Sequence, residues 1–366
     1  MFLAIREMKH SKLKYGLIGL IMVLIAWLVF FVSGLAQGLS SDNASAIQKM
    51  DADYIVLQKD AEHRLTRSTM TEPQLQGVNQ YVDKDGEPLG IQMTAITKEG
   101  ASKKIDVTFF AVDAKGYLMP NVIEGKNIDN KTKNMVIVDS SLKDEGLAVG
   151  DTIVDEISGQ TLTIEGFTEN QSFSHAPVVF MNFEAWKAMN ETKINKGVLG
   201  YNAIAIQGSQ DKADRIEKNV PGIETITMNE ALQGIPGYSE EQGSLLMMIV
   251  FLFIIAAFVL AVFFYVLTIQ KVNQFGVLKA IGAKFTYLAR NIISQVIVLS
   301  VISLAISVGL TYGISLLLPS SMPFDLSISL VVGCSALFLL ISVIGSLLSL
   351  YRVAKVDAVE AIGRAA

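Results

Sequence analysis

Histidine, cysteine and phosphate-binding motifs are the parts of this 366-residue chain where chemistry is most easily recognised. His63 and His175 have no cysteine partner and no HExxH spacing, so neither belongs to a metal or hydrolytic motif. The only cysteine, Cys334, can form no intramolecular disulfide. No GxxxxGK(S/T) segment is present to hold nucleotide phosphates. We therefore expect no catalytic residues, no metal site and no ATPase activity in this chain. We predict that the chain is not itself an enzyme.

Four long charge-free intervals are the elements that must position any functional side chain. Hydrophobic residues make up 51% of the chain, and the mean hydropathy is +0.42. A helix of about 20 apolar residues crosses the roughly 30 Å hydrocarbon core of a membrane. The intervals lie between Lys14 and Asp42, Glu241 and Lys271, Arg290 and Asp325, and Asp325 and Arg352. The fold class predicted is a membrane protein with four transmembrane α-helices and a large α+β extracellular domain inserted between helices 1 and 2.

The distribution of charge predicts the orientation, because lysine and arginine are retained on the cytoplasmic side of a membrane. Residues 42–241 hold 31 of the 35 acidic and 19 of the 30 basic residues. The termini and the 271–290 loop together hold 11 basic and 3 acidic residues. Both termini are therefore predicted to be cytoplasmic. The expected segments are a cytoplasmic N-terminal segment (1–14), helix 1 (15–41), the extracellular domain (42–241), helix 2 (242–270), a cytoplasmic coupling elbow (271–290), helix 3 (291–318), an extracellular turn (319–325), helix 4 (326–351) and a cytoplasmic tail (352–366).

A cleaved signal peptide is the alternative interpretation of the first interval, since basic residues precede it and small residues follow at 34–36. The apolar run 15–32 is longer than a typical signal core. Trp27, Phe30 and Phe31 also suit a permanent span, which we favour.

The central 42–241 segment has the pattern of a mixed α+β domain. Alternating or continuous apolar runs bounded by turn residues predict strands at 53–57, 105–112, 134–138, 152–157 and 161–166, the last two as a hairpin. Helical spacing predicts short helices at 72–81, 183–190, 211–219 and 229–232.

Serine and threonine form stripes at helical spacing in the last two spans. The stripes comprise Ser300, Ser303, Ser307 and Thr311 in the third span, and Ser335, Ser342, Ser346 and Ser349 in the fourth. Small hydroxyl residues allow helices to approach closely in lipid, so we favour helix packing over a serine-lined substrate path. No ionisable residue occupies a span, which argues against ion-coupled transport and requires another energy source.

The elbow 271–290 is basic and contains no acidic residue. Its apolar residues recur at helical spacing, and glycines at 276 and 282 allow bends. A helix lying on anionic lipid headgroups and a docking helix for a cytoplasmic partner both fit this pattern. The candidate coupling residues are Phe275, Gly276, Val277, Leu278, Lys279, Ala280, Ile281 and Gly282.

The segment 275–283 and the tail 356–362 resemble the FtsX/MacB superfamily of ABC transporter permeases, over the whole chain. Ala358 departs from the family pattern, which usually has proline there. The resemblance implies a permease driven by two copies of a cytoplasmic ABC ATPase subunit that binds ATP and Mg. It also implies a homodimer of this chain, contact with membrane lipid and no nucleic-acid partner.

Further segments, at 33–39, 247–250, 263–271 and 322–324, are similar to haem-exporting members of that superfamily. This similarity implies haem efflux and haem detoxification at the plasma membrane of a Gram-positive bacterium, with haem as the transported ligand and no intrinsic cofactor. Haem needs an axial ligand, an apolar slot and polar groups for its propionates. The provisional set at the outer membrane surface is Tyr238, His175, Phe173, Gln58 and Leu57.

Two alternatives use the same scaffold. One is an exporter of peptides, lipids or drugs. This alternative stays open because the central segment, which would select the substrate, carries few recognisable motifs. The other is an FtsX-like signalling subunit that controls an extracellular cell-wall hydrolase and moves no substrate.

Overall fold

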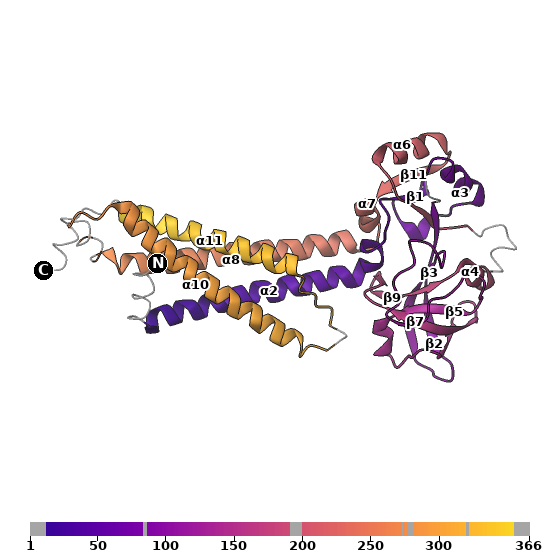
Figure 1. Ribbon diagram of the computed structural model, residues 1–366, viewed down its shortest axis with the longest axis horizontal. Helices are drawn as coiled ribbons and strands as arrows, with labels where there is room; N and C mark the ends of the chain where they lie inside the picture. The colour runs from indigo at the N-terminus through magenta and orange to yellow at the C-terminus, as the bar shows by residue number, and fades with distance from the viewer. Residues whose placement is uncertain are drawn as a thin grey trace. The chain divides into compact units, whose positions relative to one another are not determined.

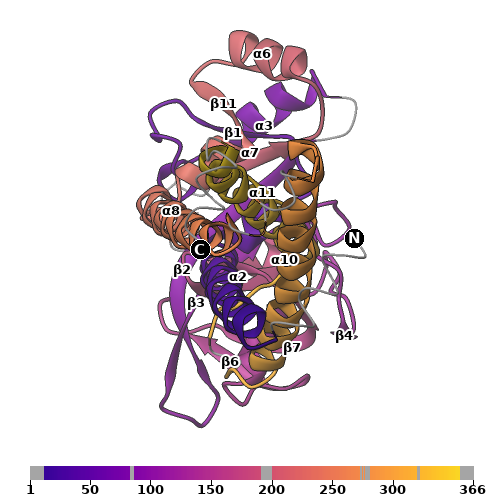
Figure 2. The ribbon, with the colours of Figure 1, turned by 90° about the vertical axis from the view of Figure 1, so that its left-hand side faces the viewer.

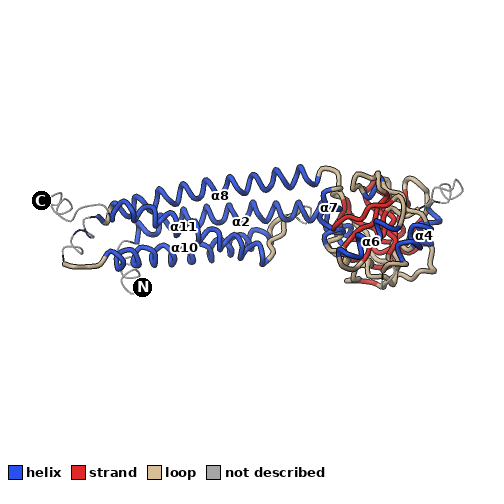
Figure 3. The backbone as a smooth tube through the Cα atoms, turned by 90° about the horizontal axis from the view of Figure 1, so that it is seen from above, coloured by secondary structure: helices blue, strands red, loops and turns tan. Residues whose placement is uncertain are grey.

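The computed structural model describes residues 12–82, 86–190, 200–272, 274, 276, 281–319 and 322–354. They divide into two compact units, described separately here. The helix bundle comprises the described residues up to 38, those of 243–319 and those from 324 onward; the sheet domain comprises those of 39–242 and 320–323. Figure 1 labels the elements, and Figure 3 separates the helices of the bundle from the strands of the sheet domain by colour.

Four helices are long and apolar enough to cross a membrane: α2 (Lys12–Gln48), α8 (Tyr238–Ile269), α10 (Phe285–Ser315) and α11 (Ile328–Ala354). Hydrocarbon offers no partner to backbone N–H and C=O groups, so helices, which satisfy them internally, are the form that such segments adopt. The prediction of four transmembrane helices is confirmed. Helices α2 and α8 extend beyond the bundle, because residues 39–48 and 238–242 belong to the sheet domain.

The serine stripe of α10 packs inside the bundle. In Figure 2, α2 and α8 are seen close to end-on and α10 runs lengthwise down the view. Ser300, Ser303, Ser307 and Thr311 are at most 1% exposed. The Ser303 hydroxyl donates to the Gly19 carbonyl of α2 at 3.3 Å, and the Ser307 hydroxyl donates to the Val23 carbonyl at 2.9 Å. On α11, Ser349 lies 2.9 Å from Thr268 of α8. These contacts support the helix-packing interpretation of the stripes.

The segment between α10 and α11 is fixed to α2 at a glycine. The Asp325 N–H donates to the Gly34 carbonyl at 3.0 Å, and the Phe324 ring packs against Phe31 with centroids 5.5 Å apart. A Cβ atom at position 34 would lie 2.6 Å from Cζ of Phe324. Glycine at this position therefore makes room for the phenylalanine.

The sheet domain contains eleven strands among its described residues. The strands are β1 (Tyr54–Gln58), β2 (Glu87–Lys98), β3 (Lys104–Ala111), β4 (Glu124–Gly125), β5 (Met135–Asp139), β6 (Thr152–Asp155), β7 (Thr161–Thr168), β8 (Ser172–Phe173), β9 (Ala176–Met181), β10 (Ala203–Ile206) and β11 (Ile223–Thr227). The helices of this domain are η1 (Leu65–Arg67), α3 (Glu72–Asn79), η2 (Ser140–Lys143), α4 (Phe183–Met189), α6 (Gln210–Asn219) and α7 (Met228–Gln233).

The strand order is β11-β1-β10-β2-β3-β9-β5-β7-β4, with β6 beside β2 and β7, and β8 beside β9. Pairs β3–β9 and β5–β7 are parallel and the remaining pairs are antiparallel. Successive strand residues point to opposite faces, so neighbours enter different cores. Phe110 and Phe180 are buried in one core, whereas Phe109 and Val179 are buried in the other.

The α+β class predicted from the sequence is confirmed. The five predicted strands correspond to β1, β3, β5, β6 and β7, and β6 and β7 form the expected antiparallel hairpin. The four predicted helices correspond to α3, α4, α6 and α7. The prediction omitted the other six strands, β2, β4, β8, β9, β10 and β11. Among them β2 is twelve residues long and contains Pro88 and Gly90, residue types that usually mark turns.

We predict that Gly34→Ala destabilises the chain although alanine favours helices. The new Cβ displaces Phe324, and overpacking of this kind costs about 1–3 kcal/mol. Gly16→Ala is the matched control, because a Cβ atom there meets nothing within 4 Å. The control variant is expected to gain about 1 kcal/mol of stability from the higher helix propensity of alanine. Thermal unfolding in detergent measures both. Equal stability of the two variants would contradict the prediction, and Phe324→Ala is expected to rescue Gly34→Ala.

Candidate functional site

A strained hairpin turn places His175 against the end of α2. Strands β8 and β9 are joined by Ser174 and His175, whose φ angles are 53° and 61°. Residues other than glycine rarely adopt this left-handed region, and they do so mainly where surrounding contacts hold them. Here the Ser174 N–H donates to the Asn43 carbonyl at 2.7 Å, and the Ser172 N–H donates to the Ser45 hydroxyl at 2.8 Å. The turn is therefore held by α2.

The His175 imidazole lies between two carboxylates. Its Nδ1 atom is 2.8 Å from Oδ2 of Asp42 on α2, and its Nε2 atom is 3.5 Å from Oε2 of Glu241 on α8. The Asn43 side-chain amide donates to the same Glu241 oxygen at 2.6 Å. When Nδ1 carries the proton, it donates to Asp42 and leaves the Nε2 lone pair available. This histidine–carboxylate pair is the arrangement that orients histidine ligands of metals.

Tyr238, the first residue of α8, contacts the same stretch of α2. Its hydroxyl lies 3.4 Å from the Ser40 hydroxyl, and it accepts a hydrogen bond from the Gln48 amide at 3.4 Å. Gln48 also donates to Ser40. The structure thus attaches His175 and Tyr238 to one ten-residue stretch of α2, residues 39–48, within the sheet domain.

The other three residues of the provisional set have structural roles in this conformation. Leu57 is fully buried, and Phe173 is 1% exposed and packs edge-to-face on Phe110 with centroids 5.6 Å apart. The Gln58 side-chain oxygen accepts from the Thr69 N–H at 3.3 Å. Leu57 and Phe173 are therefore core residues in this conformation, whereas Gln58 is exposed. His175 and Tyr238 are the candidates that contact α2.

The coupling residues of the elbow fall mostly outside the described residues. Phe275, Val277, Leu278, Lys279 and Ala280 lie outside them, as does the 356–362 tail. Of the rest, Gly282 has a φ of 92°, a conformation that favours glycine, and Ile281 is 77% exposed. Helix α10 begins three residues later, at Phe285.

A buried polar cluster connects three segments of the bundle, and the sequence did not reveal it. The Tyr15 hydroxyl of α2 and the Lys271 ammonium after α8 both donate to Oε1 of Gln295 on α10, at 2.9 and 2.7 Å. The ammonium also lies 5.5 Å from the centre of the Tyr15 ring. All three residues are less than 10% exposed. The one available signal was a glutamine early in an apolar interval. Because Lys271 starts the elbow, this cluster ties the elbow to α2 and α10.

Four apolar helices with an α+β domain inserted after the first define an integral membrane protein with the architecture of a transporter permease. The model of the FtsX-like permease C-terminal family matches residues 246–358. The chain is 31% identical to "Putative hemin transport system permease protein HrtB" of Staphylococcus haemolyticus and 30% identical to the protein of the same name from Staphylococcus epidermidis, each match covering 99% of both chains. The chain belongs to the FtsX-like family of ABC transporter permeases.

More distant similarities were also found. An uncharacterized ABC transporter permease of Mycobacterium tuberculosis is 23% identical over 99% of both chains. Among solved structures, the periplasmic region of MacB from Actinobacillus actinomycetemcomitans is similar with a TM-score of 0.37 and 11% identity, covering 51% of this chain and 93% of that one.

Because the chain belongs to the ABC permease family, it is the membrane component of a transporter and works with a cytoplasmic ATPase partner.

We predict that Gln295→Leu destabilises the bundle by about 2 kcal/mol, because the buried Lys271 ammonium loses a hydrogen-bond acceptor. Gln295→Glu is the matched control, since it keeps an acceptor at this position and adds an opposite charge. Thermal unfolding of the purified chain in detergent provides the comparison. If the leucine variant unfolds at the wild-type temperature, the cluster is not a stabilising contact.

Proposed function

We propose that this chain is the permease subunit of an efflux pump that exports haem from the plasma membrane of a Gram-positive bacterium. The observation that carries the proposal is the full-length relationship to two staphylococcal proteins whose names state hemin transport. Two copies of this chain act with two copies of the ATPase, which binds Mg and ATP and supplies the energy of transport. The biological role is haem detoxification.

The proposed orientation has both termini in the cytoplasm and residues 42–241 outside. The excess of basic residues in the termini and the elbow supports it, as does the acidic balance of 31 to 19 in the central segment. In this orientation the end of α2 and the start of α8 reach the outer membrane surface. His175 and Tyr238 then lie where an amphipathic ligand leaves the lipid.

The chemistry of the His175 site suits an iron porphyrin. An imidazole nitrogen is a common axial ligand of haem iron, and tyrosine is another. The 2.8 Å contact between Nδ1 and Asp42 would keep Nε2 as the ligand atom and hold the orientation of the imidazole ring. Binding iron at Nε2 requires that Nε2 turn away from Glu241, which now lies 3.5 Å from it. Glu241 stays anchored by Asn43 in either case.

Transport requires that ATP-driven closure of the ATPase pair reach this site. In the proposed mechanism the elbow receives that motion, and the cluster of Tyr15, Lys271 and Gln295 passes it to α2 and α10. Helix α2 continues without interruption from this cluster at Tyr15 to Asp42 and Asn43 beside His175. In the proposed mechanism, a displacement of α2 changes the contact that Asp42 makes with His175.

We predict that haem added to the purified permease with its ATPase produces a saturable Soret shift that depends on His175. His175→Ala is expected to weaken binding at least tenfold, and Asp42→Asn about tenfold, as is usual when the partner of a histidine ligand is removed. Tyr238→Phe tests the second candidate ligand and is expected to weaken binding as well. His63→Ala is the matched control, because His63 is similarly exposed and pairs with another carboxylate, Glu224, at 3.8 Å.

The same preparations test whether haem binding at this site is coupled to ATP hydrolysis. Haem is expected to stimulate the ATPase of the wild-type complex and of His63→Ala, and to stimulate it less in His175→Ala. Haem binding that is unaffected by His175→Ala, Asp42→Asn and Tyr238→Phe would refute this site. Absence of any specific Soret shift would refute haem as the substrate. Stimulation by a peptide, lipid or drug, or copurification of a cell-wall hydrolase, would then identify the alternative roles.

A further inference from the structure

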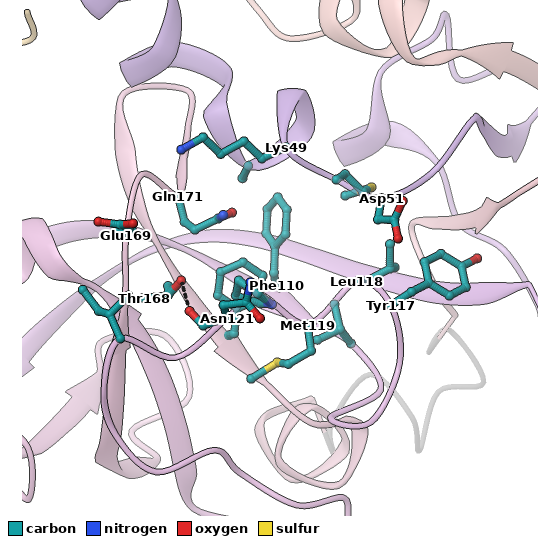
Figure 4. Close-up of a pocket in the computed structure, with 16 residues that line it drawn as sticks. Lys49, Asp51, Phe110, Tyr117, Leu118, Met119, Asn121, Thr168, Glu169 and Gln171 are labelled. Carbon is teal, nitrogen blue, oxygen red and sulfur yellow. Dashed lines mark hydrogen bonds between the residues drawn. The ribbon is translucent and has the colours of Figure 1, made fainter. Parts of the chain in front are cut away.

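A long groove lies on the surface of the helix bundle, between α2 and α10. Its volume is about 800 Å³, within the range of roughly 300–1,000 Å³ that ligand sites occupy. Apolar residues form most of its lining, over 12–23 of α2 and 298–310 of α10, and Lys12 is the one charged residue among the described residues that line it. The cavity of the sheet domain in Figure 4 differs in character, because its lining includes the charged residues Lys49, Asp51 and Glu169.

Two glycines of α2 give the groove its depth. A Cβ atom at Gly16 would meet nothing within 4 Å, so open space reaches the helix backbone there. At Gly19 a Cβ atom would lie 3.3 Å from Cδ1 of Leu299, so α10 closes on the helix one turn later. Leu20 and Ile302 form the walls and are 55% and 48% exposed. An empty gap of this kind forfeits the dispersion contacts of its lining atoms, which an acyl chain would supply.

The length of the groove matches one leaflet of a membrane. From Lys12 to Val23 the helix rises about 17 Å along its axis. Half of the roughly 30 Å hydrocarbon core is about 15 Å. One acyl chain of a single leaflet therefore spans the groove when its headgroup lies beside Lys12.

Helices α2 and α10 run in the same direction along the groove. Ser303 of α10 bonds to Gly19 of α2, and four residues later Ser307 bonds to Val23. The starts of the two helices are therefore at the same end of the bundle, which is the end that Lys12 occupies.

Cationic residues gather at this shared end. Four exposed ones stand near the starts of α2 and α10, namely Lys12, Lys14, Lys284 and Arg290. Asp325 is the one acidic residue among the described residues of the bundle, and its N–H bonds to Gly34, toward the other end. Basic residues near a membrane surface attract anionic lipid, so the charge favours an anionic headgroup at the end of the groove.

We propose that the groove binds an anionic phospholipid, with one acyl chain between α2 and α10 and the phosphate beside Lys12. Basic sites between transmembrane helices hold anionic headgroups in this way. A second copy of this chain suits the groove less well, because a two-fold axis there would bring the cationic ends of both copies together. The site does not depend on haem export. In the orientation proposed above, its headgroup end faces the cytoplasm.

Native mass spectrometry of the purified full-length chain, delipidated in detergent, measures the lipid that binds. Dioleoyl phosphatidylglycerol and dioleoyl phosphatidylcholine share their acyl chains and differ in net charge, so their comparison isolates the headgroup. Phosphatidylglycerol is expected to bind about tenfold more tightly. It is also expected to raise the temperature of thermal unfolding, because a ligand of the folded state stabilises it.

Two pairs of variants locate the site. Gly16→Leu places a side chain in the groove and is expected to weaken phosphatidylglycerol binding about tenfold. Gly313→Leu is the matched control, because a Cβ atom there also meets nothing within 4 Å and Gly313 does not line the groove. Lys12→Gln is expected to weaken phosphatidylglycerol binding about fivefold and to leave phosphatidylcholine unchanged. Lys126→Gln removes an exposed lysine of the sheet domain and should change neither.

Equal binding of the two phospholipids, or wild-type binding of phosphatidylglycerol by Gly16→Leu, would overturn the proposal. If Gly16→Leu changes the number of chains in the complex and not its bound lipid, the groove is a contact between copies and the proposal is also wrong. A negative Soret titration would refute haem export and leave the lipid measurements intact.

Discussion

The bundle depends on how closely α10 can approach α2. In lipid, one apolar helix surface has no preference for another over the acyl chains, so adhesion requires close contact and hydrogen bonds across the interface. Ser303 and Ser307 supply both, because their small side chains let the backbones approach and their hydroxyls donate to carbonyls of α2. The third span thereby fixes the position of α2. The Gly34–Asp325 hydrogen bond restrains the same helix farther along its length.

Helix α2 consequently contributes residues both to the buried polar cluster of the bundle and to the His175 site. One end contributes Tyr15 to the buried polar cluster of the bundle. The other end contributes Asp42 and Asn43 to the His175 site.

Local sequence signals predicted much of this fold. Apolar intervals of sufficient length identified the four membrane helices, because in lipid a helix satisfies its backbone hydrogen bonds within a single segment. Period-two alternation identified strands such as β3, whose residues alternate between the two cores of the sheet domain. Strand β2 was missed because it contains Pro88 and Gly90, which usually mark turns. Its pairing with β3, β6 and β10, which lie elsewhere in the sequence, makes it a strand.

The candidate site was predicted only in part, because contacts between residues far apart in the sequence leave no local pattern. His175 and Tyr238 were proposed from resemblance, and the structure places both beside α2. Asp42, Glu241 and Asn43 were not proposed, because their relation to His175 spans 66 to 133 residues of sequence and no spacing rule reaches so far. Leu57 and Phe173 were also proposed, and both are buried in one core of the sheet domain. Proximity in sequence to a ligand candidate does not distinguish a side chain on the surface from one in the core.

The left-handed turn at Ser174 and His175 bears on how this protein should be engineered. Glycine adopts such backbone angles without strain, so a library selected for thermal stability would be enriched in glycine at these two positions. Such variants would gain melting temperature while losing the imidazole that the turn presents between Asp42 and Glu241. Efforts to stabilise this permease for crystallisation or biosensing should therefore hold position 175 constant and seek their gains elsewhere in the sheet domain.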